Sequence, residues 1–231
     1  MPGGRPRGFD KDEALDRALE LFWRNGFEGT SVADLTEAMG VARPSLYAAF
    51  GDKDELFRAV VARYLAGPGS YVQRALERGR TADAIRTLLL DAAAAVTAPD
   101  RPPGCFVVHG ALACGEEGGA ARDLLAAERL NRQAAIRARL ERGAGKGDLP
   151  DGADVVLLTE WVMTTLHGLA VQALGGAGRA VLTAVTEHAV RMLGLDGPGA
   201  IAPAKRGGAI RRTPGKRAKP DKQAGQLAMD L

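Results

Sequence analysis

The chain has 231 residues, of which 46% are hydrophobic, so it can bury a core in one medium domain or two small ones. Ala, Leu and Arg are abundant and aromatic residues make up only 5%, which favours helices over sheets. We find no apolar run near the roughly 20 residues of a membrane-spanning helix and no signal-peptide core at the N-terminus. Composition therefore predicts an all-α cytoplasmic protein without a membrane partner.

The net charge of +3 is unevenly distributed along the chain. Residues 197–231 hold eight Lys and Arg against two Asp, a balance of +6, which leaves −3 for residues 1–196. Residues 1–66 hold nine basic and eleven acidic side chains. Because sequence-independent DNA affinity depends on Lys and Arg neutralising phosphates, charge alone does not indicate a DNA-binding protein.

Four helices are predicted in the first 66 residues. Asp10 and Glu13 form a capping-box pattern before a helix over 11–25 that ends at Gly26. Thr30 or Ser31 caps a short helix that ends at residue 39. A third helix spans about 43–50, and a fourth begins after the next capping box, at 52–55.

Beyond residue 67 the periodicity predicts further helices, joined mostly by Gly- and Pro-rich segments. They span about 70–78, 82–97, 105–114, 120–142, 152–174 and 177–193. Residues 197–231 lose this periodicity and are rich in Gly, Pro, Lys and Arg, so we expect a disordered basic tail. The tail is interpreted as a solvated extension, with a loose electrostatic tether to DNA as the alternative.

The second and third helices, with a glycine in the turn between them, form the parts of a helix-turn-helix over about 31–50. If Leu46 and Phe50 face the core, then Pro44, Ser45 and Ala48 point outward. That face suits a major groove, although the same spacing also fits surface residues of an ordinary three-helix bundle.

Each outward residue type suggests a contact with DNA. Ser45 suits a base edge and Ala48 a thymine methyl, while Pro44 fits the first turn of the helix. Arg43 suits either a guanine or the backbone. Phosphate contacts are expected from the hydroxyls near the second helix, from a phenol on the third and from an ammonium at the start of the fourth: Thr30, Ser31, Tyr47 and Lys53.

The stretch TSVADLTEAMGVARPSLYAAFGDKDELF, from Thr30 to Phe57, resembles the DNA-binding region of TetR/AcrR-family (tetracycline-repressor-like) regulators. Its LYxxF run and its K(D/E)xL entry to the fourth helix lie in register with that family, and the resemblance extends over about 8–67. It implies that Thr30, Arg43, Ser45, Tyr47 and Lys53 fall on DNA-contacting positions. Ala42 departs from the usual Ser or Thr cap, and Ala49 stands where His or Tyr is common.

By the same resemblance, residues 68–196 form a helical effector-binding and dimerisation domain. We expect a homodimer in which the last two long helices of each subunit form the interface. The dimer would hold its two reading helices about 34 Å apart and bind a near-palindromic double-stranded operator. The alternative is that both helices serve only the core of one subunit. The predicted interface residues are Leu157, Trp161, Thr165, Gly168, Val171, Val181, Val185 and Met192.

The segment PPGCFVVHGALACG, 102–115, looks like one found in one branch of the family and does not identify a ligand. Cys105, His109, Trp161 and His167 are predicted to line a pocket for an unknown small-molecule effector. No zinc-ligand spacing occurs, so no metal and no cofactor is expected. The two cysteines, Cys105 and Cys114, are interpreted as buried thiols on opposite faces of one helix, with a redox pair as the alternative.

The sequence gives weaker support to two other functional classes. An enzyme that uses Cys105, His109 and Cys114 has no phosphate loop, paired carboxylates or nucleophile motif to support it. An architectural DNA-binding protein would depend on its basic tail. The sequence therefore predicts a non-enzymatic, ligand-responsive transcriptional regulator, with repression as the family's commoner mode.

Overall fold

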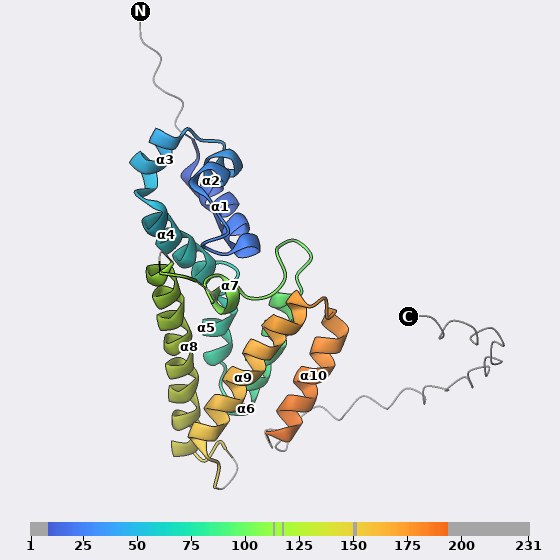
Figure 1. Cartoon of the computed structure of the whole chain (residues 1–231). Coiled ribbons are helices and arrows are strands. Elements are labelled where there is room, and N and C mark those ends of the chain that lie inside the picture. The colour runs from blue at the N-terminus through green and yellow to red at the C-terminus, as the bar shows by residue number, and fades with distance from the viewer. Residues whose placement is uncertain (1–8, 113, 117, 150–151, 194–231) are drawn as a thin grey trace, which may run out of the picture. The chain divides into compact units, whose positions relative to one another are not determined.

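The computed structural model describes residues 9–112, 114–116, 118–149 and 152–193. Helix is the only regular secondary structure of these residues, which confirms the predicted all-α fold class (Figure 1). The N-terminal group contains α1 (Lys11–Asn25), α2 (Val32–Met39), α3 (Arg43–Phe50) and α4 (Lys53–Ala66). The remaining helices are α5 (Tyr71–Leu76), α6 (Thr81–Val96), α7 (Phe106–His109), α8 (Gly119–Gly145), α9 (Val155–Leu174) and α10 (Arg179–Met192).

Side-chain caps fix where the N-terminal helices begin. The Asp10 carboxylate accepts hydrogen bonds from two first-turn amides of α1. Ser31 caps α2 in a capping box with Asp34, and Asp52 caps α4 in another with Glu55. Each cap satisfies amide groups that the helix leaves unpaired, and such a cap typically contributes about 1 kcal/mol. Of the two cap residues proposed for α2, the structure selects Ser31.

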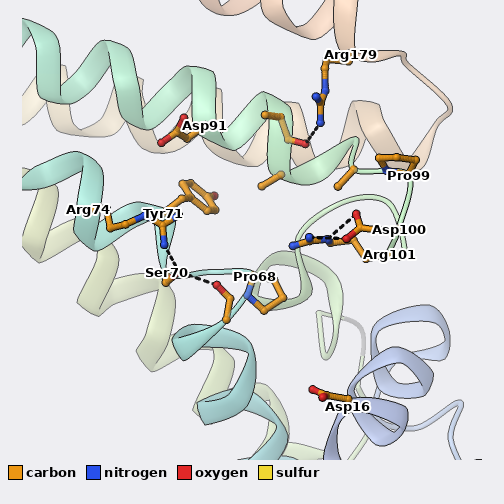
Figure 2. Close-up of a pocket in the computed structure, with 14 residues that line it drawn as sticks. Asp16, Pro68, Ser70, Tyr71, Arg74, Asp91, Pro99, Asp100, Arg101 and Arg179 are labelled. Atoms are coloured by element: carbon orange, nitrogen blue, oxygen red, sulfur yellow. Dashed lines mark hydrogen bonds and ion pairs between the residues drawn. The ribbon is translucent and has the colours of Figure 1, made fainter. Parts of the chain in front are cut away.

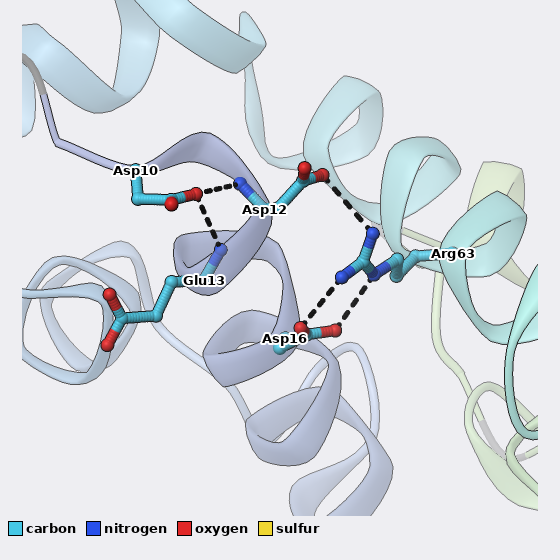
Figure 3. A network of polar contacts seen from close by, with 5 residues as sticks. All are labelled: Asp10, Asp12, Glu13, Asp16 and Arg63. Atoms are coloured by element: carbon cyan, nitrogen blue, oxygen red, sulfur yellow. Dashed lines mark hydrogen bonds and ion pairs between the residues drawn. The ribbon is translucent and has the colours of Figure 1, made fainter.

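An ion-pair network joins α1 to α4 (Figure 3). The Arg63 guanidinium donates to both carboxylate oxygens of Asp16, each at 2.8 Å, and to Asp12 at 3.2 Å. The bidentate pair lowers the pKa of Asp16, mainly through its hydrogen bond to Arg63. Because α4 also supports α3, this network helps to hold the four N-terminal helices as one unit.

Aromatic rings continue the core from the N-terminal helices into the rest of the chain. Phe57 of α4 packs edge-on against Phe22 at 5.0 Å and against Phe106 of α7 at 5.4 Å. Trp23 and Tyr64 form another edge-on pair at 5.0 Å. The buried core therefore runs without interruption past residue 67, where the sequence places a domain boundary. The boundary at residue 67 stays a prediction, as do the predicted bounds of the regions 68–196 and 197–231.

The C-terminal helices pack around α6, which contacts α5, α8, α9 and α10. Helix α8 packs against α9 and reaches α4, α5 and α7. Apolar residues of α6 that recur three and four apart, including Ile85, Leu88 and Leu89, are fully buried. Contrary to the expectation from the sequence, one described helix, α9, is long and apolar enough to cross a membrane by length and composition alone, and a third of its most apolar window is buried in this chain.

One predicted helix is wrong. The expected helix over 105–114 is reduced to the single turn of α7, and Cys114 lies in the following loop. The cause is tertiary: the Gly110 carbonyl accepts a hydrogen bond at 2.8 Å from the amide of Phe27. The two cysteines therefore do not share a helix, and only Cys105 is buried, while Cys114 is partly exposed. The predicted tail, 197–231, lies outside the described residues.

Candidate nucleic-acid interface

The geometry of a helix-turn-helix lies between Ser31 and Phe50. Helix α2 ends at Gly40, whose φ of +66° is the left-handed conformation that favours glycine. The chain reverses there and enters α3 three residues later, at Arg43. Leu35 and Met39 of α2 and Leu46 of α3 are buried and fix the angle between the two helices. Core packing therefore leaves the opposite side of α3 facing outward.

Helix α3 exposes the residues that the sequence assigns to its outer face. Pro44, Ser45 and Ala48 are all exposed, and Leu46 is completely buried, as expected. Phe50 is only half-buried and lies with its ring centroid 6.0 Å from that of Phe9. The exposed face thus combines small side chains, which permit close approach, with a hydroxyl that suits a base edge.

Arg43 and Tyr47 form a pair at one edge of this face. The guanidinium donates weakly to the phenol oxygen at 3.3 Å and lies 5.7 Å from the ring centroid. Both side chains are exposed, and Tyr47 is 41% accessible. A cation and a hydroxyl one helical turn apart can contact adjacent phosphates of a DNA strand. Arg43 retains further N–H donors for a base edge or the backbone.

The side chains predicted to contact phosphates near the starts of α2 and α4 differ in their exposure. Thr30 is completely buried, and its hydroxyl donates to the Gly26 carbonyl at 2.7 Å. The expectation that this hydroxyl faces a phosphate is corrected, because the α1–α2 turn uses it internally. Ser31 is exposed at the start of α2. The ammonium of Lys53, at the start of α4, lies 4.2 Å from the centroid of the Phe27 ring.

Helix α3 begins without a side-chain cap. Ala42 adopts the extended backbone of an N-cap residue but makes no side-chain cap hydrogen bond. Two following amides, those of Ser45 and Leu46, both donate to its carbonyl, and Pro44 has no amide hydrogen to satisfy. Few first-turn donors therefore stay unpaired despite the departure from the usual capping residue.

The face proposed for dimerisation is apolar and exposed on α9 and α10. Among its residues, Leu157 is 63%, Val181 59% and Met192 69% accessible, and Gly168 has open space around it. Trp161 and Thr165 are half-buried and line a groove of about 470 Å³ between the two helices. The other predicted residues, Val171 and Val185, are also exposed.

The four residues predicted to line an effector pocket do not all lie at one site. Trp161 lies in the groove between α9 and α10, and the Nε2 atom of His109 bonds to the Trp23 carbonyl at 3.1 Å. Burial lowers the pKa of His109. Cys105 is buried next to the Tyr64 hydroxyl at 3.2 Å. His167, on α9, has a buried Nε2 atom without a hydrogen-bond partner.

A polar cleft of about 900 Å³ lies where several elements meet, and the sequence does not predict it (Figure 2). Asp16 of α1, Tyr71 of α5, Asp91 of α6 and Arg179 of α10 line it, together with the loop that holds Arg101. These residues are far apart in the sequence, so no local pattern brings them together. Among the described residues no cluster of potential metal ligands occurs.

Two family models match this chain. That of bacterial regulatory proteins of the tetR family matches residues 14–60, and that of the tetracyclin repressor-like C-terminal domain matches residues 81–189. The chain belongs to the TetR family. In Escherichia coli K12, the HTH-type transcriptional repressor ComR is 32% identical over 191 residues, which cover 82% of this chain and 91% of ComR. Family membership confirms the predicted helix-turn-helix class of DNA-binding transcriptional regulators.

Solved structures include similar TetR-family proteins. A cysteine-substituted variant of the regulator CifR, complexed with 26-base-pair operator DNA, is 44% identical with a TM-score of 0.77. The match covers 81% of this chain and 98% of that one. A TetR regulator of Rhodococcus sp. RHA1 is 38% identical with a TM-score of 0.55, over 80% of this chain and 99% of that one.

Proposed function

We propose that this TetR-family protein is a cytoplasmic, homodimeric repressor that releases a near-palindromic operator when it binds a small molecule. The outward face of α3 carries the proposal, because its exposed residues match those needed to enter a major groove. Ser45 and Ala48 contact bases, while Arg43, Tyr47 and Lys53 contact phosphates or, for Arg43, a guanine. The operator complex of CifR, 44% identical to this chain, supports this assignment. The proposal includes no catalytic step.

Selection of genomic fragments with the purified protein tests the operator contacts. Tyr47→Ala should weaken binding to all selected sites alike, because a phosphate contact carries no sequence information. Ser45→Ala should change which sites are selected, since it removes a base contact. Arg86, exposed on α6, provides the control Arg86→Ala, which should leave both profiles unchanged. Equal effects of all three changes would contradict the proposed reading face.

The apolar face of α9 and α10 supports self-association. A four-helix bundle between two subunits would cover Leu157, Val181, Val185 and Met192, whose exposure to water is unfavourable in a monomer. Val181→Glu places a charge in that face and should shift the protein to a monomer in light scattering. Arg86→Glu is the matched surface control. A Val181→Glu variant that remains dimeric and binds operator with unchanged affinity would refute this interface.

A further inference from the structure

A buried arginine in the middle of α8 lacks an anionic partner. Arg132 is 7% exposed, and among the described residues its guanidinium has one hydrogen-bond contact, to the Cys105 sulfur at 3.8 Å. It takes part in none of the ion pairs found there. A guanidinium has five N–H donors in a rigid planar fork, and it keeps its charge in proteins. A buried cation with one weak contact is unfavourable without an additional acceptor.

Arg139, one heptad further along α8, shows what a structural buried arginine looks like in this protein. Its guanidinium donates to the Thr81 hydroxyl at 2.6 Å and to the carbonyls of Arg78 and Gly79 at 3.0 and 2.9 Å. The two arginines are similarly buried, at 7% and 6% exposure. Arg139 is satisfied by the chain itself, whereas Arg132 has one hydrogen-bond contact among the described residues.

The groups around Arg132 do not balance its charge. Burial raises the pKa of Tyr64 and of Tyr71, so both phenols are neutral at physiological pH. Burial disfavours the charged form of Arg132, yet the net direction of its pKa is upward, and a guanidinium keeps its charge in proteins. Arg132 is therefore charged, and its surroundings contain polar but uncharged oxygens.

His167 provides a second unsatisfied group on the facing helix α9. Burial is the main cause that lowers its pKa, and the positive charges of Arg132 and Arg129 add to the effect. The imidazole is therefore neutral, and its buried Nε2 atom has no hydrogen-bond partner. Arg129 is already engaged, since its guanidinium donates to the Val107 carbonyl at 2.8 Å. One cation and one unsatisfied imidazole nitrogen thus share this interior region.

We propose that Arg132, assisted by His167, anchors an effector that carries a single carboxylate group. A carboxylate accepts two parallel hydrogen bonds from a guanidinium fork and supplies the one negative charge that the region lacks. A dianionic phosphate would exceed that charge. The inference rests on the proposed function and names the chemical class of its small molecule.

The polar cleft shares one residue, Tyr71, with the surroundings of Arg132. Tyr71 is the most buried of the larger side chains that line the cleft (Figure 2). Its charge interactions with Arg132 and Cys105 place it close to both residues. The rest of the effector occupies the cleft, where Asp91 and Arg101 offer polar contacts. A ligand that extends from the cleft to Arg132 therefore has to pass Tyr71.

The anchor also touches the helix that supports the DNA-binding unit. Cys105 contacts Arg132 on one side and the Tyr64 hydroxyl of α4 on the other. A carboxylate on Arg132 replaces the sulfur as its acceptor and so changes the contact between Cys105 and α4. An effector alters operator affinity only through such a difference between the two states.

Alkylation of Cys105 by a charged and a neutral reagent tests this site in the full-length protein. In a Cys114→Ser background Cys105 is the remaining thiol. In both reactions its sulfur bonds to the reagent's methylene carbon as the carbon–iodine bond breaks, iodide leaves, and the thiol proton passes to water. Iodoacetate carries the carboxylate probe, and iodoacetamide is its neutral counterpart. We expect the iodoacetate-to-iodoacetamide rate ratio to fall about tenfold or more in Arg132→Met, because the reagent loses a nearby cation. Arg132→Lys keeps the charge and should retain most of the ratio.

Several results would overturn the proposal. One is an equal rate ratio in wild type, Arg132→Met and Arg132→Lys, and another is a folded protein whose Cys105 neither reagent alkylates. Stronger protection of Cys105 by inorganic phosphate than by acetate at equal concentration would contradict the carboxylate class. If Arg132→Met does not fold, judged by its circular dichroism, the comparison of wild type with Arg132→Lys and the two competitors decides.

The same samples test the link to DNA. The carboxymethylated protein holds a carboxylate beside Arg132 and should bind operator more weakly than the carbamidomethylated protein, whose adduct is neutral. Equal operator affinity of the two adducts would refute the effector role of the site. Unmodified Cys114→Ser protein is the reference. Its failure to bind any selected operator would contradict the proposed function. The alkylation rate ratios would still test the anion site independently.

Discussion

Leu46 and Ser45 are neighbours on α3 that face opposite ways, so a pair of substitutions separates the folding role of this helix from its DNA contacts. Leu46 is completely buried and is the single fully buried side chain of α3, whereas Ser45 is exposed. Truncating a buried leucine to alanine removes apolar contacts and leaves a cavity, which together cost about 3 kcal/mol or more. Replacing an exposed serine changes stability by less than about 0.5 kcal/mol.

We therefore expect Leu46→Ala to lower the free energy of unfolding by about 3 kcal/mol and to speed hydrogen exchange in α3. Operator affinity should fall for every site, because the whole reading face loses its support. Ser45→Ala should keep the stability and change the preferred sites. Urea unfolding, amide exchange and fluorescence anisotropy with selected operators measure these effects. A loss of stability below about 1 kcal/mol in Leu46→Ala, or equal losses in both variants, would refute the orientation of α3.

Three further substitutions or titrations probe the rest of the structure. Arg63→Met should destabilise the chain only slightly, since water screens these exposed ion pairs. NMR should show Asp16 titrating at higher pH in this variant, and an unchanged Asp16 pKa would contradict the network. Because burial lowers the pKa of His109, its contribution to stability is complete above the unfolded value of about 6.5 and is lost as pH falls through the folded pKa. The free energies of unfolding of wild type and His109→Gln, measured in urea, should therefore converge as the pH falls. If the two depend on pH in parallel, His109 does not contribute to the pH dependence of stability. Gly104→Ala should destabilise strongly, because φ there is +82° and a Cβ would lie 2.8 Å from an α9 side chain; Gly79→Ala, with open space, is the control, and equal melting temperatures would contradict the packing.

Local signals predicted the DNA-binding half well. Capping residues, the glycine at 40 and the buried spacing of Leu35, Met39 and Leu46 all act within a few residues, so the sequence contains them completely. Thr30 was misassigned because its burial depends on how the α1–α2 turn closes, and its hydroxyl bonds to the Gly26 carbonyl within that turn. Resemblance identified the right segment but did not determine the orientation of this side chain.

The C-terminal half was harder to predict because its site depends on tertiary contacts. The helix expected over 105–114 ends early where Gly110 bonds to the α1–α2 turn. Arg132 was overlooked, although a signal for it exists: it lies seven residues after Leu125 and four before Ile136, on the buried stripe of α8. A charged residue on an apolar stripe indicates a buried polar contact, and spacing alone could not have identified its partner.

Contacts of unequal strength around α4 indicate which parts move together. Arg63 and Tyr64 are adjacent, yet the first clamps α4 to α1 through three hydrogen bonds and the second meets Cys105 through one. The α1–α2 turn bonds to the α7 segment through the Phe27 amide and the Gly110 carbonyl, and the ring of His109 bonds to the Trp23 carbonyl of α1. Arg63 joins α4 to α1 by three hydrogen bonds, whereas Tyr64 joins α4 to Cys105 by one. A ligand beside Cys105 should therefore displace the four N-terminal helices as one unit. The spacing between the two reading helices of a dimer would then change, while α3 keeps its own packing.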